Sequence, residues 1–102
     1  MITVVRTANI HDGKIDAAFA WAVKIAKYGR DKLGMNTQVA RNIGGELYQL
    51  HWVSTYPSLA DAEKATKHAE GDEGFKALVG EARQQGLLVG TSIRDSIYES
   101  VG

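Results

Sequence analysis

The sequence contains no cysteine, and this absence excludes disulfide bonds, thiolate metal sites and cysteine nucleophiles. It also has no excess of charge, because 12 basic residues balance 12 acidic residues. Nucleic acid is therefore not an expected partner, since its binding depends on lysine and arginine side chains that neutralise phosphates. A basic patch that would bind a membrane surface is absent for the same reason.

No apolar run approaches the ~20 residues that are needed to span a bilayer. The N-terminal segment MITVVRTANIHDG has too short an apolar run for a signal peptide, so we expect a cytoplasmic protein. The length of 102 residues and the hydrophobic content of 44% fit a single globular domain over residues 1–102.

What is present is an alternation of strand-like and helix-like segments. Residues 2–11 are rich in β-branched side chains and predict a strand, after which Asp12 is a candidate helix cap. Residues 14–33 carry apolar side chains at steps of three and four, which predict a long helix that ends at Gly34.

The middle of the chain predicts a β-hairpin followed by a helix. Residues 35–43 and 46–56 read as strands on either side of a glycine pair at 44–45, which indicates a tight turn. Ser58 follows the only proline and is a candidate N-cap, with Asp61 in the capping-box position.

The last part of the chain predicts two helical pieces and a strand. The first piece runs from Ser58 to about His68, and the second covers 72–85 and ends at Gly86. Residues 87–101 predict a long strand. Alternation places a set of its side chains on one face, namely Val89, Thr91, Ile93, Asp95 and Ile97.

The resulting order is βαββαβ, which is the ferredoxin-like arrangement of the α+β class. It predicts a four-stranded antiparallel sheet with the helices on one face and the other face bare. An uncovered sheet face of this kind needs a second cover, and two copies of the domain can supply it.

The strand at 46–56 places neighbouring side chains on opposite faces. Its more apolar set contains Trp52, which we expect in the core, and its other set contains His51, which we expect on the bare face. A bulge that shifts the register would reverse this assignment, so the opposite parity stays open. The expected bare face is semi-polar and fits the lining of a wet cavity between two copies; it includes Val5, Thr7, Asn9, His11, Gln49, His51 and Val53.

The element order and the segments HWVSTYPSLADAEKA (51–65) and GDEGFKALVGEARQQGLLVGTSIRDSIYE (71–99) resemble the dimeric α+β-barrel superfamily. Within it they are most similar to NIPSNAP-like and antibiotic-biosynthesis-monooxygenase-type proteins. The resemblance implies a homodimer whose two sheets close into one barrel. It also implies a small-molecule pocket in each protomer, between sheet and helices or inside the barrel.

Some relatives of this type use an asparagine of the first strand together with a later tryptophan and histidine. The resemblance implies these roles for Asn9, which would hold a substrate oxygen, for Trp52, which would shape the pocket, and for His68, which would act as a base or an axial haem ligand. The segment between Trp52 and His68 is longer than in that family. The alternative for His68 is an exposed histidine that interacts with the helix dipole.

The residues themselves indicate a second candidate, in which His51 beside Asn9 or His11 forms a proton-transfer pair. Histidine suits this role because its usual pKa of ~6.5 allows acid and base work near neutrality. The alternative is a histidine that is satisfied by a threonine, a glutamine or water. Candidate substrate-binding residues are Trp52, Tyr48, Tyr56, His11, Gln49 and His68.

Other groupings carry less chemistry. His11, Asp12 and His51 are the only plausible metal ligands and lack a metal-binding spacing, so we expect no metal and no other cofactor. The tyrosines, Tyr98 included, are either contacts for a phenolic ligand or ordinary core and interface aromatics. A second stripe on the first helix, opposite the core stripe, is either a contact surface or pocket wall, or is partly exposed; it consists of Trp21, Lys24 and Tyr28.

Three functions fit these observations. The first is binding of a small, largely apolar or aromatic molecule in a pocket at the sheet, and it leaves open whether the protein is an enzyme. The second is a cofactor-independent monooxygenase that acts on a phenolic or quinone-like substrate. The third is a dimeric structural or regulatory module without a ligand.

Overall fold

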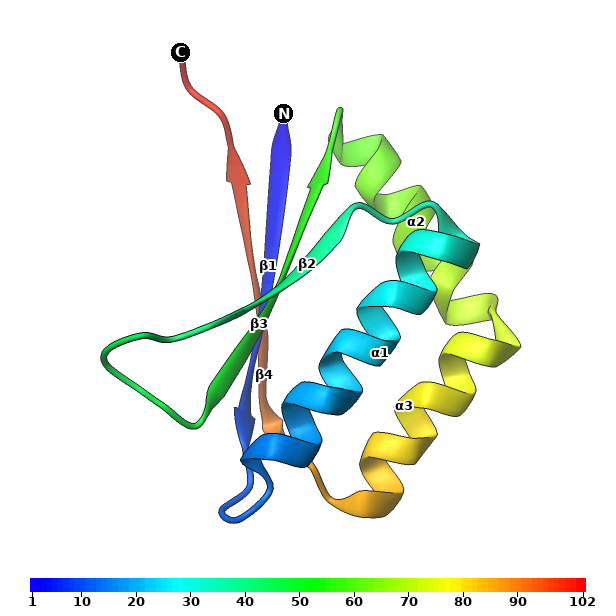
Figure 1. Ribbon diagram of the computed structural model, residues 1–102. Coiled ribbons are helices and arrows are strands. Elements are labelled where there is room, and N and C mark those ends of the chain that lie inside the picture. Colours follow the sequence, from blue (N-terminus) through cyan, green and yellow to red (C-terminus); the bar gives the residue numbers. More distant parts are fainter.

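The computed structural model describes residues 1–102 and contains four strands and three helices. Their order is β1 (Ile2–Ile10), α1 (Ile15–Leu33), β2 (Thr37–Arg41), β3 (Gln49–Tyr56), α2 (Leu59–Gly71), α3 (Glu73–Gln85) and β4 (Leu88–Glu99). The strands form one antiparallel sheet in the order β2-β3-β1-β4, and all helices lie on one side of it (Figure 1). The predicted ferredoxin-like α+β architecture is confirmed. None of the helices is both long and apolar enough to cross a membrane.

The helix ends follow local chemistry. Gly34 and Gly86 have φ values of 65° and 63°, the left-handed conformation that glycine adopts without strain, and both stops are as predicted. The Ser58 hydroxyl oxygen accepts the Asp61 backbone N–H at 3.2 Å, which confirms the N-cap of α2. The prediction that Asp12 caps α1 is wrong, because the chain turns at Gly13 and the helix begins only after Lys14, which makes no side-chain cap.

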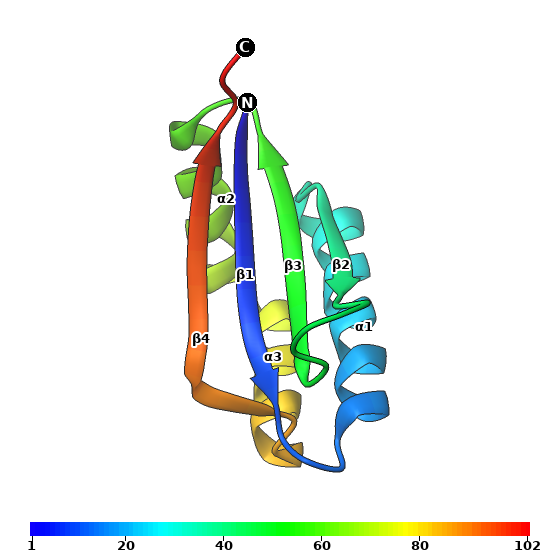
Figure 2. The same ribbon diagram turned by 90° about the vertical axis from the view of Figure 1, so that its left-hand side faces the viewer.

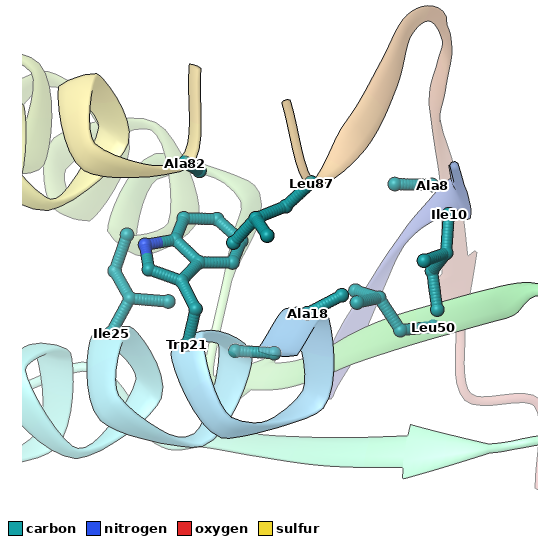
Figure 3. Close-up of a cluster of buried hydrophobic side chains, with 9 residues drawn as sticks. Ala8, Ile10, Ala18, Trp21, Ile25, Leu50, Ala82 and Leu87 are labelled. Carbon is teal, nitrogen blue, oxygen red and sulfur yellow. The ribbon is translucent and has the colours of Figure 1, made fainter. Parts of the chain in front are cut away.

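The core lies between the sheet and the helices and is organised around two tryptophans. Trp21 of α1 and Trp52 of β3 meet edge to face, with ring centroids 5.5 Å apart. The Trp21 Nε1–H donates to the Leu78 carbonyl at 2.8 Å, so this large side chain is buried with its polar atom satisfied. Figure 3 shows Trp21 reaching from α1 toward Leu87. The core position predicted for Trp52 is confirmed.

The second stripe of α1 is a contact surface within the protomer, because Trp21 lies in the core and the other two residues hold α3 in place. The Tyr28 hydroxyl donates to the Asp72 carboxylate at 2.6 Å, and Lys24 pairs with Glu81 at 3.2 Å. Asp72 also caps α3 by accepting the Phe75 backbone N–H at 2.9 Å. The hydroxyl of Tyr28, and then this N–H, lower the pKa of Asp72 below its usual value of 3.8.

The connection between β2 and β3 differs from the predicted tight turn. The last rung joins Arg41 to Leu50, and residues 42–48 then form a longer loop that we call the arm. At the start of the arm the Asn42 side chain bonds His51 and not a residue of β2. Figures 1 and 2 show the arm leaning away from the helices, over the open side of the sheet.

A bulge in β4 overturns part of the predicted face of the last strand. Thr7 pairs with Arg94, but Asn9 pairs with Val89, so β4 carries extra residues between these rungs. The Ser92 hydroxyl oxygen accepts the Asn9 backbone N–H at 2.8 Å and so takes the place of a strand carbonyl. Val89 consequently faces the open side with Arg94. It does not share the helix-side face of Ile93, Asp95 and Ile97 as predicted.

Gly74 at the start of α3 leaves room for the Tyr28 ring, which would have to move if a side chain were added there. A Cβ at this position would lie 2.1 Å from the tyrosine hydroxyl oxygen. In Gly74→Ala we expect Tyr28 to lose its bond to Asp72 and the free energy of unfolding to fall by about 1–2 kcal/mol. Urea denaturation checks this. The matched control is Gly80→Ala in the same helix, where no atom lies within 4 Å of the new Cβ. Equal stability of the two variants would contradict the role of Gly74.

Candidate functional site

A row of polar side chains crosses β1 and β3 on the face of the sheet that no helix covers. Thr7 stands opposite His51, and their side chains bond through Thr7 Oγ1 and His51 Nδ1 at 2.8 Å. On the other side of the ring, His51 Nε2 lies 2.6 Å from Asn42 Oδ1. The next rung joins Gln49 Nε2 to Asn9 Oδ1 at 3.2 Å. The position predicted for His51 on the bare face is confirmed.

This row holds His51 and leaves it no free ring nitrogen. Because the Asn42 oxygen accepts from Nε2–H, Nδ1 of the neutral ring accepts the hydroxyl proton of Thr7. Thr7 is only 8% exposed, so its hydroxyl has little access to other partners. The geometry therefore supports the alternative of a satisfied histidine over a proton-transfer pair, with Thr7 as one partner. Asn42 is the other partner, and the sequence did not indicate it because the predicted strand at 35–43 contains Asn42 and ends in a tight turn.

The three residues that the family resemblance grouped are not brought together. Asn9 lies on the open face and bonds Gln49. Trp52 lies on the opposite, helix-covered face, where it packs against the core. His68 lies on the exposed surface of α2. A substrate that touched all three would have to pass through the sheet, so this grouping has no geometric basis in the protomer.

A hollow of about 620 Å³ lies where the end of β3 meets the end of α1 and the side of α2. It brings together two of the predicted site residues, Tyr56 and His68. Tyr56 and Leu33 are buried and form its apolar part, whereas Lys64 and His68 are exposed on α2. The remaining lining residues are Met1, Gly34, Asn36, Thr55, Pro57, Asp61 and Ala65.

Of the charged side chains around this hollow, some are already bonded within the protein and one is free to bind a ligand. Asp61 is occupied by the cap of α2, since its carboxylate accepts the Ser58 hydroxyl at 2.9 Å. Lys64 makes no ion pair, whereas Lys67 on the same helix pairs with Glu63 at 3.0 Å. The hollow thus presents a free ammonium group and an imidazole beside a buried tyrosine ring. This combination suits a small molecule with an apolar ring and an anionic substituent.

The other predicted candidates lie outside this hollow. Tyr48 belongs to the arm and His11 follows β1, and neither side chain bonds His51. Tyr98 is exposed on β4, opposite Thr3. No group of three or more metal-binding side chains is present, so His11, Asp12 and His51 do not form such a group.

A second hollow, of about 430 Å³, lies between α1 and α3. Much of its charge is already paired, Lys24 with Glu81 and Lys27 with Asp31. Lys32 is its one unpaired charge, and the hydroxyl of its only tyrosine, Tyr28, already bonds Asp72, so this hollow lacks the buried ring that Tyr56 supplies to the other.

The bond between Thr7 and His51 can be tested by a nearly isosteric change. In Thr7→Val the imidazole Nδ1 loses its partner, and we expect the free energy of unfolding to fall by about 1–2 kcal/mol. The ¹⁵N chemical shifts of the His51 ring should move as well. The control is Thr3→Val on the same face of β1, because the Thr3 hydroxyl makes no side-chain hydrogen bond. If both variants behave alike, the bond does not hold His51.

No family model and no curated protein sequence matches the chain. Solved structures are nevertheless similar over its whole length. A protein of Deinococcus radiodurans, provisionally described as an antibiotic biosynthesis monooxygenase, is 14% identical, with a TM-score of 0.72 and coverage of 100% of this chain and 94% of that chain. An uncharacterised NIPSNAP domain protein of Burkholderia xenovorans is 17% identical, with a TM-score of 0.73 and coverage of 99% and 95%.

A NIPSNAP family protein of Agrobacterium tumefaciens is 21% identical, with a TM-score of 0.77 and coverage of 98% of this chain and 85% of that chain. Because these identities are low, the likeness shows the fold alone. The chain has the ferredoxin-like α+β fold that these NIPSNAP and antibiotic-biosynthesis-monooxygenase-like proteins share.

Proposed function

We propose that the protein binds a small, largely apolar or aromatic molecule in the hollow beside Tyr56 and His68, and that it does so as a homodimer. The observation that carries the ligand proposal is the lining of this open hollow, which sets the buried Tyr56 and Leu33 beside the unpaired ammonium of Lys64. An aromatic ring would lie against Tyr56 and Leu33. Its anionic substituent would face Lys64.

The homodimer proposal rests on the composition of the open sheet face. The pairing of the strands places these side chains on it: Thr3, Val5, Thr7, Asn9, Gln38, Ala40, Gln49, His51, Val53, Thr55, Val89, Arg94, Ser96 and Tyr98. Arg94 is the only lysine, arginine, aspartate or glutamate among them, although such residues make up 24% of the chain. A sheet face in contact with water usually carries more charge than this.

The composition of this face favours a second copy of the chain as the partner that covers it. Two copies related by a two-fold axis place the same surface against itself, so a nearly uncharged face meets few like charges. The formal net charge of the chain is zero, and no long-range repulsion opposes association. Closing the two sheets on each other would also bury the remaining exposed surface of Val5 and Val53, which are only partly buried and which no helix covers.

The names of the similar proteins raise an oxygen-using reaction as a second candidate. The proposal here is binding without turnover, because Asn9, Trp52 and His68 lie apart and His51 has no free ring nitrogen. Consumption of dioxygen by the purified protein with a phenolic or quinone-like substrate would favour the monooxygenase instead. A dimer that binds nothing would favour the structural module.

Native mass spectrometry of freshly purified protein tests the assembly and the presence of a ligand together. We expect the mass of a dimer and a reproducible additional small-molecule mass that is lost on denaturation. A monomer at micromolar concentration would overturn the homodimer proposal. It would leave the hollow to be tested separately, as described next.

The hollow can be tested with 4-hydroxybenzoate, which combines a phenol ring with a carboxylate. In an NMR titration we expect shifts at Tyr56, Ala65 and His68, and binding about three- to tenfold weaker in Lys64→Gln, because a charge-assisted contact is lost. Lys67→Gln is the matched control, since Lys67 lies on the same helix outside the hollow. Equal weakening in both variants, or shifts away from the hollow, would contradict the site.

A further inference from the structure

We propose that the arm, residues 42–48, docks on the open sheet face of a second copy of this chain, where Glu46 pairs with the partner's Arg94. The inference rests on the proposed homodimer and goes beyond it, because it names the segment and the ion pair that select the partner. Three observations support it: the arm exposes apolar side chains, both of its ends are attached to the sheet, and Glu46 and Arg94 have no ion-pair partner within the protomer.

The arm is apolar and exposed where a solvated loop is usually polar. Ile43 is 100% exposed and Leu47 is 57% exposed, so Ile43 is uncovered and Leu47 is only partly covered by its own protomer. Tyr48, at the end of the arm, is 37% exposed. Apolar side chains gathered on one projecting segment mark a contact surface. Figures 1 and 2 agree that the segment projects to the side away from the helices, which is the side of the proposed interface.

Both ends of the arm are attached to the sheet. At its start, the Asn42 side chain bonds His51 Nε2 at 2.6 Å, and Thr7 holds the other ring nitrogen. At its end, the Tyr48 carbonyl accepts the Ile10 backbone N–H at 2.8 Å. The direction of the arm is thus set before any partner binds, which reduces the entropy lost on association. His51 is accordingly a positioning residue for the arm.

The arm and the open face each carry one unpaired charge, and the two charges are of opposite sign. Glu46 is the only charged residue of the arm, and its carboxylate bonds only a nearby backbone N–H, that of Tyr48 at 3.2 Å. Arg94 is the only charged residue that the pairing places on the open face, and its guanidinium reaches only the Ser92 carbonyl at 3.3 Å. Neither residue takes part in an ion pair of the protomer.

Each chain therefore carries both partners of the proposed ion pair, Glu46 on the arm and Arg94 on the open face. A second copy would bring these two surfaces together. A two-fold dimer forms the pair twice, once in each direction. Complementary charges at the border of an apolar contact select the partner and its register. This complementarity within one sequence favours a second copy over an unrelated protein.

Charge reversal tests the pair. We expect Glu46→Arg and Arg94→Glu each to weaken the dimer about tenfold or more at 50 mM salt, because each places like charges together twice. The double variant Glu46→Arg/Arg94→Glu should restore the dimer dissociation constant to within about threefold of the original. Sedimentation equilibrium of the full chain measures all three. Arg83→Glu is the control, since Arg83 lies exposed on α3, on the helix side of the sheet.

Each outcome decides the matter. Single reversals that leave the dissociation constant unchanged, or a double variant that stays as weak as the singles, would overturn the inference while the homodimer stands. A wild-type monomer would overturn both this inference and the homodimer, but not binding of 4-hydroxybenzoate to the hollow. Because Ile43 makes no contact within the protomer, Ile43→Ser should leave the chain folded and weaken the dimer. An unchanged dimer in this variant would also contradict docking of the arm.

Discussion

The alternation of side chains along β3 is the constraint on which the rest of the structure depends. Trp52 and His51 are joined by one peptide bond, yet they lie on opposite faces of the sheet. Trp52 meets Trp21 and joins the sheet to α1, which closes the apolar core. His51 bonds Thr7 and Asn42 and orders the face that no helix covers. A shift of one residue in the register of β3 would destroy both arrangements at once.

The helices cover one side of the sheet incompletely, and this leaves β4 as its least protected strand. Ile93 and Ile97 point to the helix side but remain 44% and 59% exposed, because β4 packs mainly on β1. The strand is held across that pairing by Arg6, whose guanidinium binds both carboxylate oxygens of Asp95 at 2.7 and 2.9 Å. The same contact lowers the pKa of Asp95 below its usual value. A small domain with so much uncovered sheet gains apolar burial by association.

The candidate chemistry lies at two places that serve different purposes. On the open face the polar side chains bond one another, so they shape a surface and do not offer reactive groups. In the hollow beside Tyr56, Lys64 is unpaired, and it can bind an added group without breaking an existing ion pair. A fold of this kind does not by itself fix an activity, because the groups that line such a hollow are not part of the core.

The sequence by itself determined the element order, the opposite placement of Trp52 and His51, the cap at Ser58 and the helix stops at Gly34 and Gly86. These features depend on backbone conformation and on neighbours a few residues away, which a linear pattern contains. Only the tertiary structure decided which distant groups meet. It joined Asn42 to His51 and replaced the predicted tight turn with the arm. It placed Ser92 in a bulge of β4 that moves the Val89 side chain to the open face. It also grouped Tyr56, Lys64 and His68 around one hollow. Such contacts depend on strand register and helix packing, and no local propensity encodes them.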